Sequence, residues 1–139
     1  MNDNIIFRKM WQDNELMQLK VVCSSSIATI VSKIYVSDSL IDDLIINIKQ
    51  FLDGYVEENL WANEDRGNDS TACLALHFLK KDKLGHILIE VFAELDDGGS
   101  YTEHNCCFFI NTEYGLLMNF CKKLEQIKES GVDYEIQLN

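Results

Sequence analysis

Two stretches of this sequence repeat apolar residues at steps of three and four, and they constrain the fold more than any other feature. A helix turns once in 3.6 residues, so this spacing lines the apolar side chains along one stripe that another element must cover. We predict one helix that begins at Ser37 or Ser39 and ends at Gly54, and another that begins near Thr112 and ends at Gly131. The stripes are Leu40, Ile41, Leu44, Ile45, Ile48, Phe51 and Leu52 in the first helix, and Leu116, Leu117, Phe120, Cys121, Leu124 and Ile127 in the second.

The remaining apolar stretches alternate with polar residues or are rich in β-branched residues, which is typical of strands. Short turn sequences at 24–26, 80–85 and 96–100 favour antiparallel pairing of neighbouring strands. The order is then β-β-β-α-β-β-β-α-β. We therefore predict a single α+β domain over residues 1–139, a two-layer sandwich in which two helices cover one face of a largely antiparallel sheet of six or seven strands. The predicted strands are 4–9, 15–23, 27–36, 71–79, 86–95, 101–111 and 132–138.

The net charge of −11 is unevenly distributed along the chain. Residues 1–36 hold four basic side chains and three acidic ones, whereas residues 37–139 hold eight basic and twenty acidic. A surface this acidic repels phosphate backbones and anionic lipid, so we expect no binding to nucleic acid or membrane. It attracts a basic protein instead and speeds the encounter with it. Acidity that serves solubility alone is the competing interpretation.

The five cysteines contain no C-x-x-C pair, and their number is odd. The first residues show no basic segment followed by an apolar run, and no apolar run approaches the ~20 residues that span a bilayer. These features predict a cytoplasmic protein whose thiols are reduced.

The stretch ELDDGGSYTEHNCC, from Glu94 to Cys107, combines acids, a histidine and two cysteines. Neighbouring residues of a strand point to opposite faces, so Cys106 and Cys107 cannot bind one metal together. His104 and Cys106 share a face, but the third ligand would have to come from Glu90, Glu94 or His86, and no spacing requires it. Nucleophile, phosphate-loop and zinc-protease motifs do not occur in the sequence. We predict no metal, no cofactor and no enzymatic activity, and a hairpin whose acids serve recognition.

Residues 56–70 form the longest predicted loop, with Trp61 in its middle. A long loop in a compact domain is often functional, although the indole could equally fix the loop to the core. One alternative function is therefore a small-molecule-binding or enzymatic domain with a pocket near this loop, and another is an oligomerisation module. Acids around a few aromatic residues suit a basic protein surface better. The expected partner-binding residues are Glu57, Glu58, Trp61, Glu64, Asp65, Glu90, Glu94, Asp96, Asp97 and Glu103.

Three runs carry a resemblance to a known family. They are IYVSDSLIDDLIINIKQFL, a strand and a leucine-rich helix; DKLGHILIEVFAEL, an Asp-x-x-Gly-His turn and a strand; and INTEYGLLMNFCKKLEQI, a strand end and a helix. Over about residues 30–128 the chain resembles the WapI-like immunity group of bacterial polymorphic-toxin systems. The resemblance implies a cytoplasmic protein that neutralises the toxin domain encoded beside it. Such toxins are often basic nucleases, so an acidic inhibitor competes with the nucleic acid. The resemblance carries over no functional residues.

Overall fold

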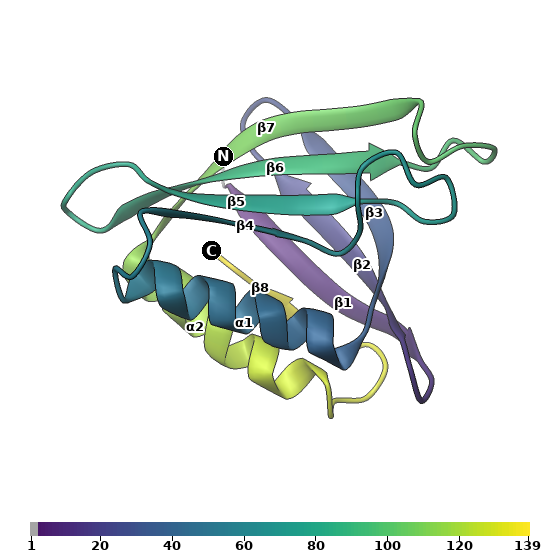
Figure 1. The fold of residues 1–139 in the computed structure, drawn as a ribbon, viewed down its shortest axis with the longest axis horizontal. Coiled ribbons are helices and arrows are strands. Elements are labelled where there is room, and N and C mark those ends of the chain that lie inside the picture. Colours follow the sequence, from purple (N-terminus) through teal and green to yellow (C-terminus); the bar gives the residue numbers. More distant parts are fainter. Residues whose placement is uncertain (1–2) are drawn as a thin grey trace.

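The computed structural model describes residues 3–139, which form two helices and eight strands (Figure 1). The α+β class and both helices were predicted correctly. The elements in chain order are β1 (Asn4–Gln12), β2 (Met17–Ser24), β3 (Thr29–Val36), α1 (Asp38–Leu52), β4 (Glu58–Ala62), β5 (Leu74–Lys80), β6 (His86–Leu95), β7 (His104–Glu113), α2 (Tyr114–Ile127) and β8 (Glu135–Gln137).

The strands form two antiparallel sheets of four strands each, so the prediction of one sheet of six or seven strands was wrong. Sheet A has the order β3-β2-β1-β8, and sheet B has the order β4-β5-β6-β7. Helix α1 follows β3 and carries the chain away from sheet A, so the next strands start a second meander. The chain returns to sheet A only through β8, which places Ile136 opposite Phe7 of β1.

Strand β4 lies inside the predicted loop 56–70 and was missed by the sequence analysis. It pairs with β5, with Trp61 opposite Leu76. The Trp61 side chain is only 3% exposed, and its Nε1 donates a hydrogen bond to the Leu40 carbonyl oxygen at 3.0 Å. The Asn59 amide also donates to the Asn47 carbonyl oxygen of α1, at 3.1 Å. Trp61 therefore fixes β4 to the core and to helix α1.

The two helices lie side by side and complete one core with both sheets (Figure 1). Helix α1 lies against β3 and β4, and α2 lies against β7 and β8, so each helix touches both sheets. The Ser37 hydroxyl caps α1 by accepting a hydrogen bond from the Leu40 N–H at 3.2 Å. Within residues 3–139, neither helix is long and apolar enough to cross a membrane.

A buried lysine supports the end of α2. The Lys9 side chain points into the core, where its Nζ donates to the carbonyl oxygens of Ser130 at 2.7 Å and Lys128 at 3.3 Å, and to Gln12 Oε1 at 2.9 Å. The last carbonyl groups of a helix have no partner within the helix, so a cation there satisfies them. Burial lowers the pKa of Lys9.

The last strand is shorter than predicted. Asp133 has a positive φ of 75°, which breaks the expected strand before Tyr134. Ile136 and Leu138 are buried as the alternation predicts, but Val132 is exposed. Asn139 then joins the two sheets, since its Oδ1 accepts from the Thr112 hydroxyl at 2.7 Å and its backbone N–H donates to Asn4 Oδ1 at 2.9 Å.

Candidate functional site

Two acidic loops meet at one end of sheet B. Asp69 Oδ1, in the loop between β4 and β5, accepts hydrogen bonds from the Ser100 hydroxyl at 3.2 Å and the Tyr101 N–H at 3.1 Å, in the loop between β6 and β7. Figure 1 shows both loops at the same end of the sheet. We name the acidic side chains of these loops the acidic end. Its members are Glu64, Asp65, Asp69, Asp96, Asp97 and Glu103, all exposed or half-buried.

The β6–β7 turn is ordered by its own carboxylates. Asp97 Oδ1 accepts from the backbone N–H groups of Gly99 at 2.8 Å and Ser100 at 2.7 Å, and Asp96 Oδ1 accepts from Gly98 at 2.8 Å. Gly98 has a φ of 93°, a conformation that favours glycine. The hydrogen bonds from Gly99 and Ser100 lower the pKa of Asp97. Asp97 is therefore ionised at neutral pH and held in one position.

Glu94 lies beneath the acidic end and is not part of its surface. Its side chain is 3% exposed. Oε1 accepts from the Cys73 N–H at 2.9 Å, and Oε2 accepts from the Gly67 N–H at 3.0 Å. The β4–β5 loop is therefore attached to β6 through this carboxylate. Two of the ten expected partner-binding residues, Glu94 and Trp61, are thus buried and cannot touch a partner in this conformation.

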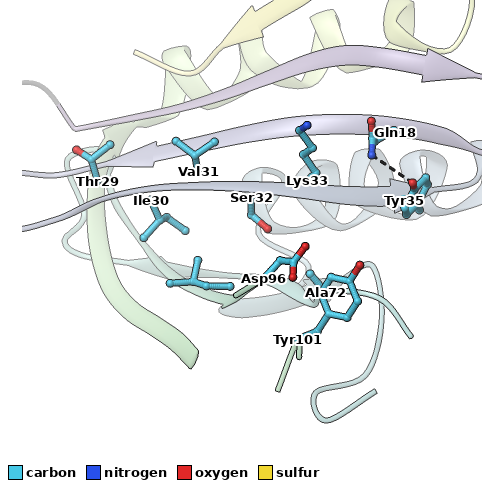
Figure 2. Close-up of a pocket in the computed structure, with 11 residues that line it drawn as sticks. Gln18, Thr29, Ile30, Val31, Ser32, Lys33, Tyr35, Ala72, Asp96 and Tyr101 are labelled. Carbon is cyan, nitrogen blue, oxygen red and sulfur yellow. Dashed lines mark hydrogen bonds between the residues drawn. The ribbon is translucent and has the colours of Figure 1, made fainter. Parts of the chain in front are cut away.

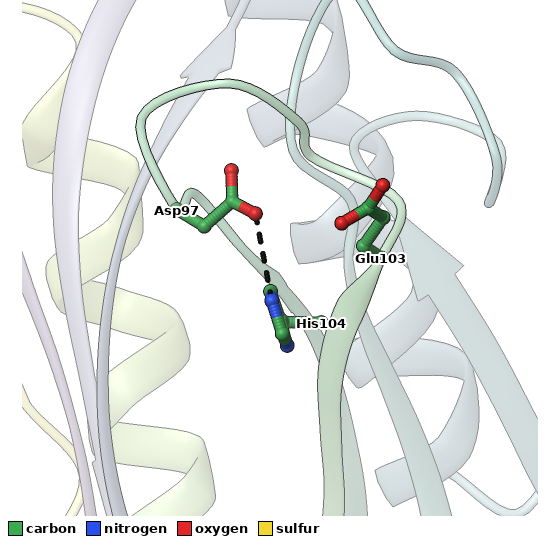
Figure 3. Close-up of side chains that lie close together, drawn as sticks. All are labelled: Asp97, Glu103 and His104. Carbon is green, nitrogen blue, oxygen red and sulfur yellow. Dashed lines mark ion pairs between the residues drawn. The ribbon is translucent and has the colours of Figure 1, made fainter.

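Asp97, Glu103 and His104 bring possible metal ligands within 4.8 Å of one another (Figure 3). His104 Nε2 lies 3.4 Å from Asp97 Oδ2, which is an ion-pair distance. All three side chains are exposed, and the other oxygen of Asp97 is occupied by backbone N–H groups. Cys106 is not in this group, because its side chain packs against the core. The arrangement is an ion-paired part of the acidic end and does not amount to a built metal site.

Three of the remaining expected residues lie away from the acidic end. Glu58 and Glu90 are on the outer face of sheet B, where they flank His77: Nε2 lies 3.3 Å from Glu58 Oε1, and Nδ1 lies 3.3 Å from Glu90 Oε1. Glu57 is exposed just before β4. The sequence analysis did not identify His77 as a member of this group. The strand register places it opposite Glu90 and would have indicated the contact.

Cys107 lies beside this group, with its Sγ 3.6 Å from Glu90 Oε2. Burial and the neighbouring carboxylate raise the pKa of this thiol. A nucleophilic cysteine needs a lowered pKa or an adjacent base that accepts its proton, whereas an ionised carboxylate at this position disfavours the thiolate. The arrangement therefore does not favour nucleophilic chemistry at Cys107.

The outer face of sheet A carries a basic row that the sequence analysis also missed. The register places Arg8 opposite Lys20, and Lys20 opposite Lys33, so three cations cross three strands side by side. Arg8 is paired with Asp133 at 3.0 Å. The positive balance of residues 1–36 was the signal for this row. Charge is thus separated, with cations on sheet A and acids on the loops of sheet B.

A cavity of about 530 Å³ lies between β3 and the two acidic loops (Figure 2). Its lining includes Lys33 and Tyr35 of sheet A, and Asp96 and Tyr101 of the β6–β7 loop. The alternative prediction placed a pocket near Trp61. Trp61 is buried in the core and does not line this cavity.

Comparisons with known proteins gave no match: no protein-family model, no curated protein and no solved structure matches this chain. The function is therefore argued from the residues of the chain.

Proposed function

We propose that this protein is an immunity protein that binds a basic toxin domain and neutralises it through the acidic end. One observation carries the proposal: Asp69 holds the two acidic loops together by accepting hydrogen bonds from Ser100 and Tyr101. The loops are thereby fixed before any partner binds, and a preordered surface loses less entropy on binding. The resemblance of residues 30–128 to the WapI-like immunity group supports the same class of function and a cytoplasmic location.

The electrostatics of the acidic end suit a cationic partner. Six carboxylates on two adjoining loops repel one another, and Arg66 is the one lysine or arginine of these loops. A basic surface would relieve this repulsion on contact. The net charge of −11 would also attract such a partner over a distance and raise the rate of association.

A basic nuclease is the kind of toxin that this surface fits best. The active site of such an enzyme binds phosphate groups through cationic side chains. Ordered carboxylates can bind the same cationic side chains. The inhibitor would then exclude the nucleic acid without chemistry of its own.

Calorimetry and stopped-flow binding would test this proposal, with the C-terminal domain of the protein encoded next to this one as the partner. The double variant Asp65→Lys with Glu103→Lys reverses two exposed charges that accept no hydrogen bond from the described residues. We expect the association rate to fall about tenfold or more, and tight binding of the unchanged protein to weaken as salt is raised from 50 to 500 mM. Glu94 and Asp97 should be left intact, because they hold the loops in place.

Asp43→Lys supplies the matched control, because it reverses an exposed charge on α1, outside the acidic end. It should slow association far less than Asp65→Lys alone, which reverses one charge within the acidic end. The electrostatic proposal is wrong if neither salt nor the double variant affects binding, or if Asp43→Lys has an equal effect. Absence of binding would reject this partner and the immunity function.

A further inference from the structure

Strand β3 forms an edge of sheet A, and within residues 3–139 no strand is hydrogen-bonded to its outer side. The Tyr35 carbonyl oxygen points to this edge, because it accepts a hydrogen bond from the Asn63 side chain at 3.4 Å. Backbone groups of a strand alternate in direction, so those of Thr29, Val31 and Lys33 point to the same edge. A row of unpaired N–H and C=O groups is a template for a further strand.

The cavity of about 530 Å³ runs along this edge (Figure 2). Thr29, Val31 and Lys33 line one side of it, and the other side is formed by Ala72, Leu95, Asp96 and Tyr101. Asn63 occupies the edge at Tyr35, so the unpaired part runs from residue 29 to residue 33 and extends over about 13 Å, at roughly 3.3 Å per residue. The open edge thus has the length of a short strand and a partly apolar wall beneath it.

The charges on the two sides of this edge are opposite. Figure 2 shows Lys33 on the outer side of β3 and Asp96 on the inner side. Neither takes part in an ion pair within residues 3–139, and neither does Lys20, the cation beside Lys33. Side chains of a strand alternate between faces, so a strand laid along β3 would present successive residues to Lys33 and to Asp96.

We propose that β3 accepts an extended segment of a partner protein as a fifth, antiparallel strand of sheet A. The segment carries a carboxylate opposite Lys33 and a cation at the next position, facing Asp96, with apolar residues around them. A second copy of this chain fits less well, because β3 contains no carboxylate and each copy has a net charge of −11. The proposal shares Asp96 with the acidic end but does not rest on the immunity function.

The probe is the labelled synthetic peptide Thr-Val-Glu-Lys-Val-Val-Thr, with blocked ends and binding followed by fluorescence anisotropy. The peptide with the two charges exchanged, Thr-Val-Lys-Glu-Val-Val-Thr, has the same composition and should bind at least about tenfold more weakly, since each charge then meets its like. A third peptide, N-methylated at its glutamate and at the valine two residues later, lacks two donors to the edge and should show no saturable binding.

Two variants of the protein test the same edge. Val31→Pro removes a backbone donor that faces the edge, so sheet A keeps its hydrogen bonds while peptide binding should be lost. Lys33→Glu should weaken binding of the first peptide at least tenfold. Asp65→Lys with Glu103→Lys should leave it nearly unchanged, because neither residue lines the cavity along β3.

Several results would overturn the proposal. One is equal binding of all three peptides, and another is no saturable binding of the first peptide at millimolar concentration. A third is full binding by Val31→Pro. Sedimentation that shows a dimer of the unchanged protein, abolished by Val31→Pro, would identify a second copy as the occupant and refute a partner segment. The peptide comparison stays decisive even where a variant fails to fold.

Discussion

Replacement of Glu94 should destabilise the fold and leave the charge of the acidic end intact. The carboxylate accepts one hydrogen bond from the buried Cys73 N–H and one from the exposed Gly67 N–H. In Glu94→Ala both donors lose their partner. In Glu94→Gln the remaining oxygen can accept from one of these N–H groups. The new NH2 group then faces the other N–H group and cannot accept from it.

The expected magnitude follows from these two bonds. A hydrogen bond to a charged group contributes about 1.5–3 kcal/mol, and a buried donor left without a partner costs the full desolvation penalty. Water can replace the carboxylate as the partner of the Gly67 N–H, so the cost of losing that hydrogen bond falls at the low end of this range. Removal of a buried charge offsets about 1 kcal/mol or more of the total. We therefore expect Glu94→Ala to lower the free energy of unfolding by about 2–4 kcal/mol, and Glu94→Gln by about 1–2 kcal/mol.

Urea unfolding followed by circular dichroism measures both changes. With a slope of about 2 kcal/mol per molar urea, a loss of 3 kcal/mol moves the midpoint down by about 1.5 M. Glu103→Gln is the matched control, because it removes an exposed carboxylate of the same loops and should change stability by less than about 0.5 kcal/mol. If Glu94→Gln is as stable as Glu103→Gln, the carboxylate does not hold the loop and our account of Glu94 is wrong.

Other predictions concern a buried lysine, an ordered carboxylate and the thiols. Lys9→Met should lower the free energy of unfolding by about 1–2 kcal/mol, measured by urea unfolding, because the Ser130 carbonyl oxygen loses a charged donor. Asp97 has a lowered pKa in the folded protein, so its contribution to stability is complete above the unfolded pKa near 3.8 and is lost as the pH falls through the folded pKa. Asp97→Asn should therefore flatten the fall in urea midpoint between pH 5 and pH 2.5. Mass spectrometry after brief alkylation at pH 8 should find Cys107 modified and Cys23 unmodified, since Cys107 is exposed and burial raises the pKa of Cys23 to about 12. An early reaction of Cys23, or an unchanged pH profile in Asp97→Asn, would contradict these accounts.

The helices and most strands could be predicted because their patterns are local. The stripe of α1 and the alternation of β6 each follow from a short window of sequence, and the predicted range 86–95 is the range of β6 in the structure. Strand β4 could not be found in this way, because it has five residues and Trp61 is its one fully buried side chain. Its position depends on β5 and α1, which lie outside the window.

The division into two sheets also depends on distant residues. We expected each strand to pair with its neighbour in sequence. No pattern within a short window of sequence shows that β3 and β4 belong to different sheets. Glu94 shows the same limit for the site. It was expected to bind a partner, but the β4–β5 loop covers the part of the sheet face on which it lies. The acidic loops could be predicted from composition, whereas the hydrogen bonds of Asp69 that join them could not.

The pairing of β8 with β1 has a consequence for how the protein folds. Ile136 lies opposite Phe7, so this contact closes a loop of nearly the whole described chain. Contacts between residues so far apart in sequence slow folding, because much chain entropy is lost before the contact forms. We expect folding in milliseconds to seconds, as for other sheets rich in distant pairings. On a ribosome, sheet A stays one strand short until residues 135–137 have emerged, so the backbone groups of β1 that pair with β8 would stay unpaired in the nascent chain until then.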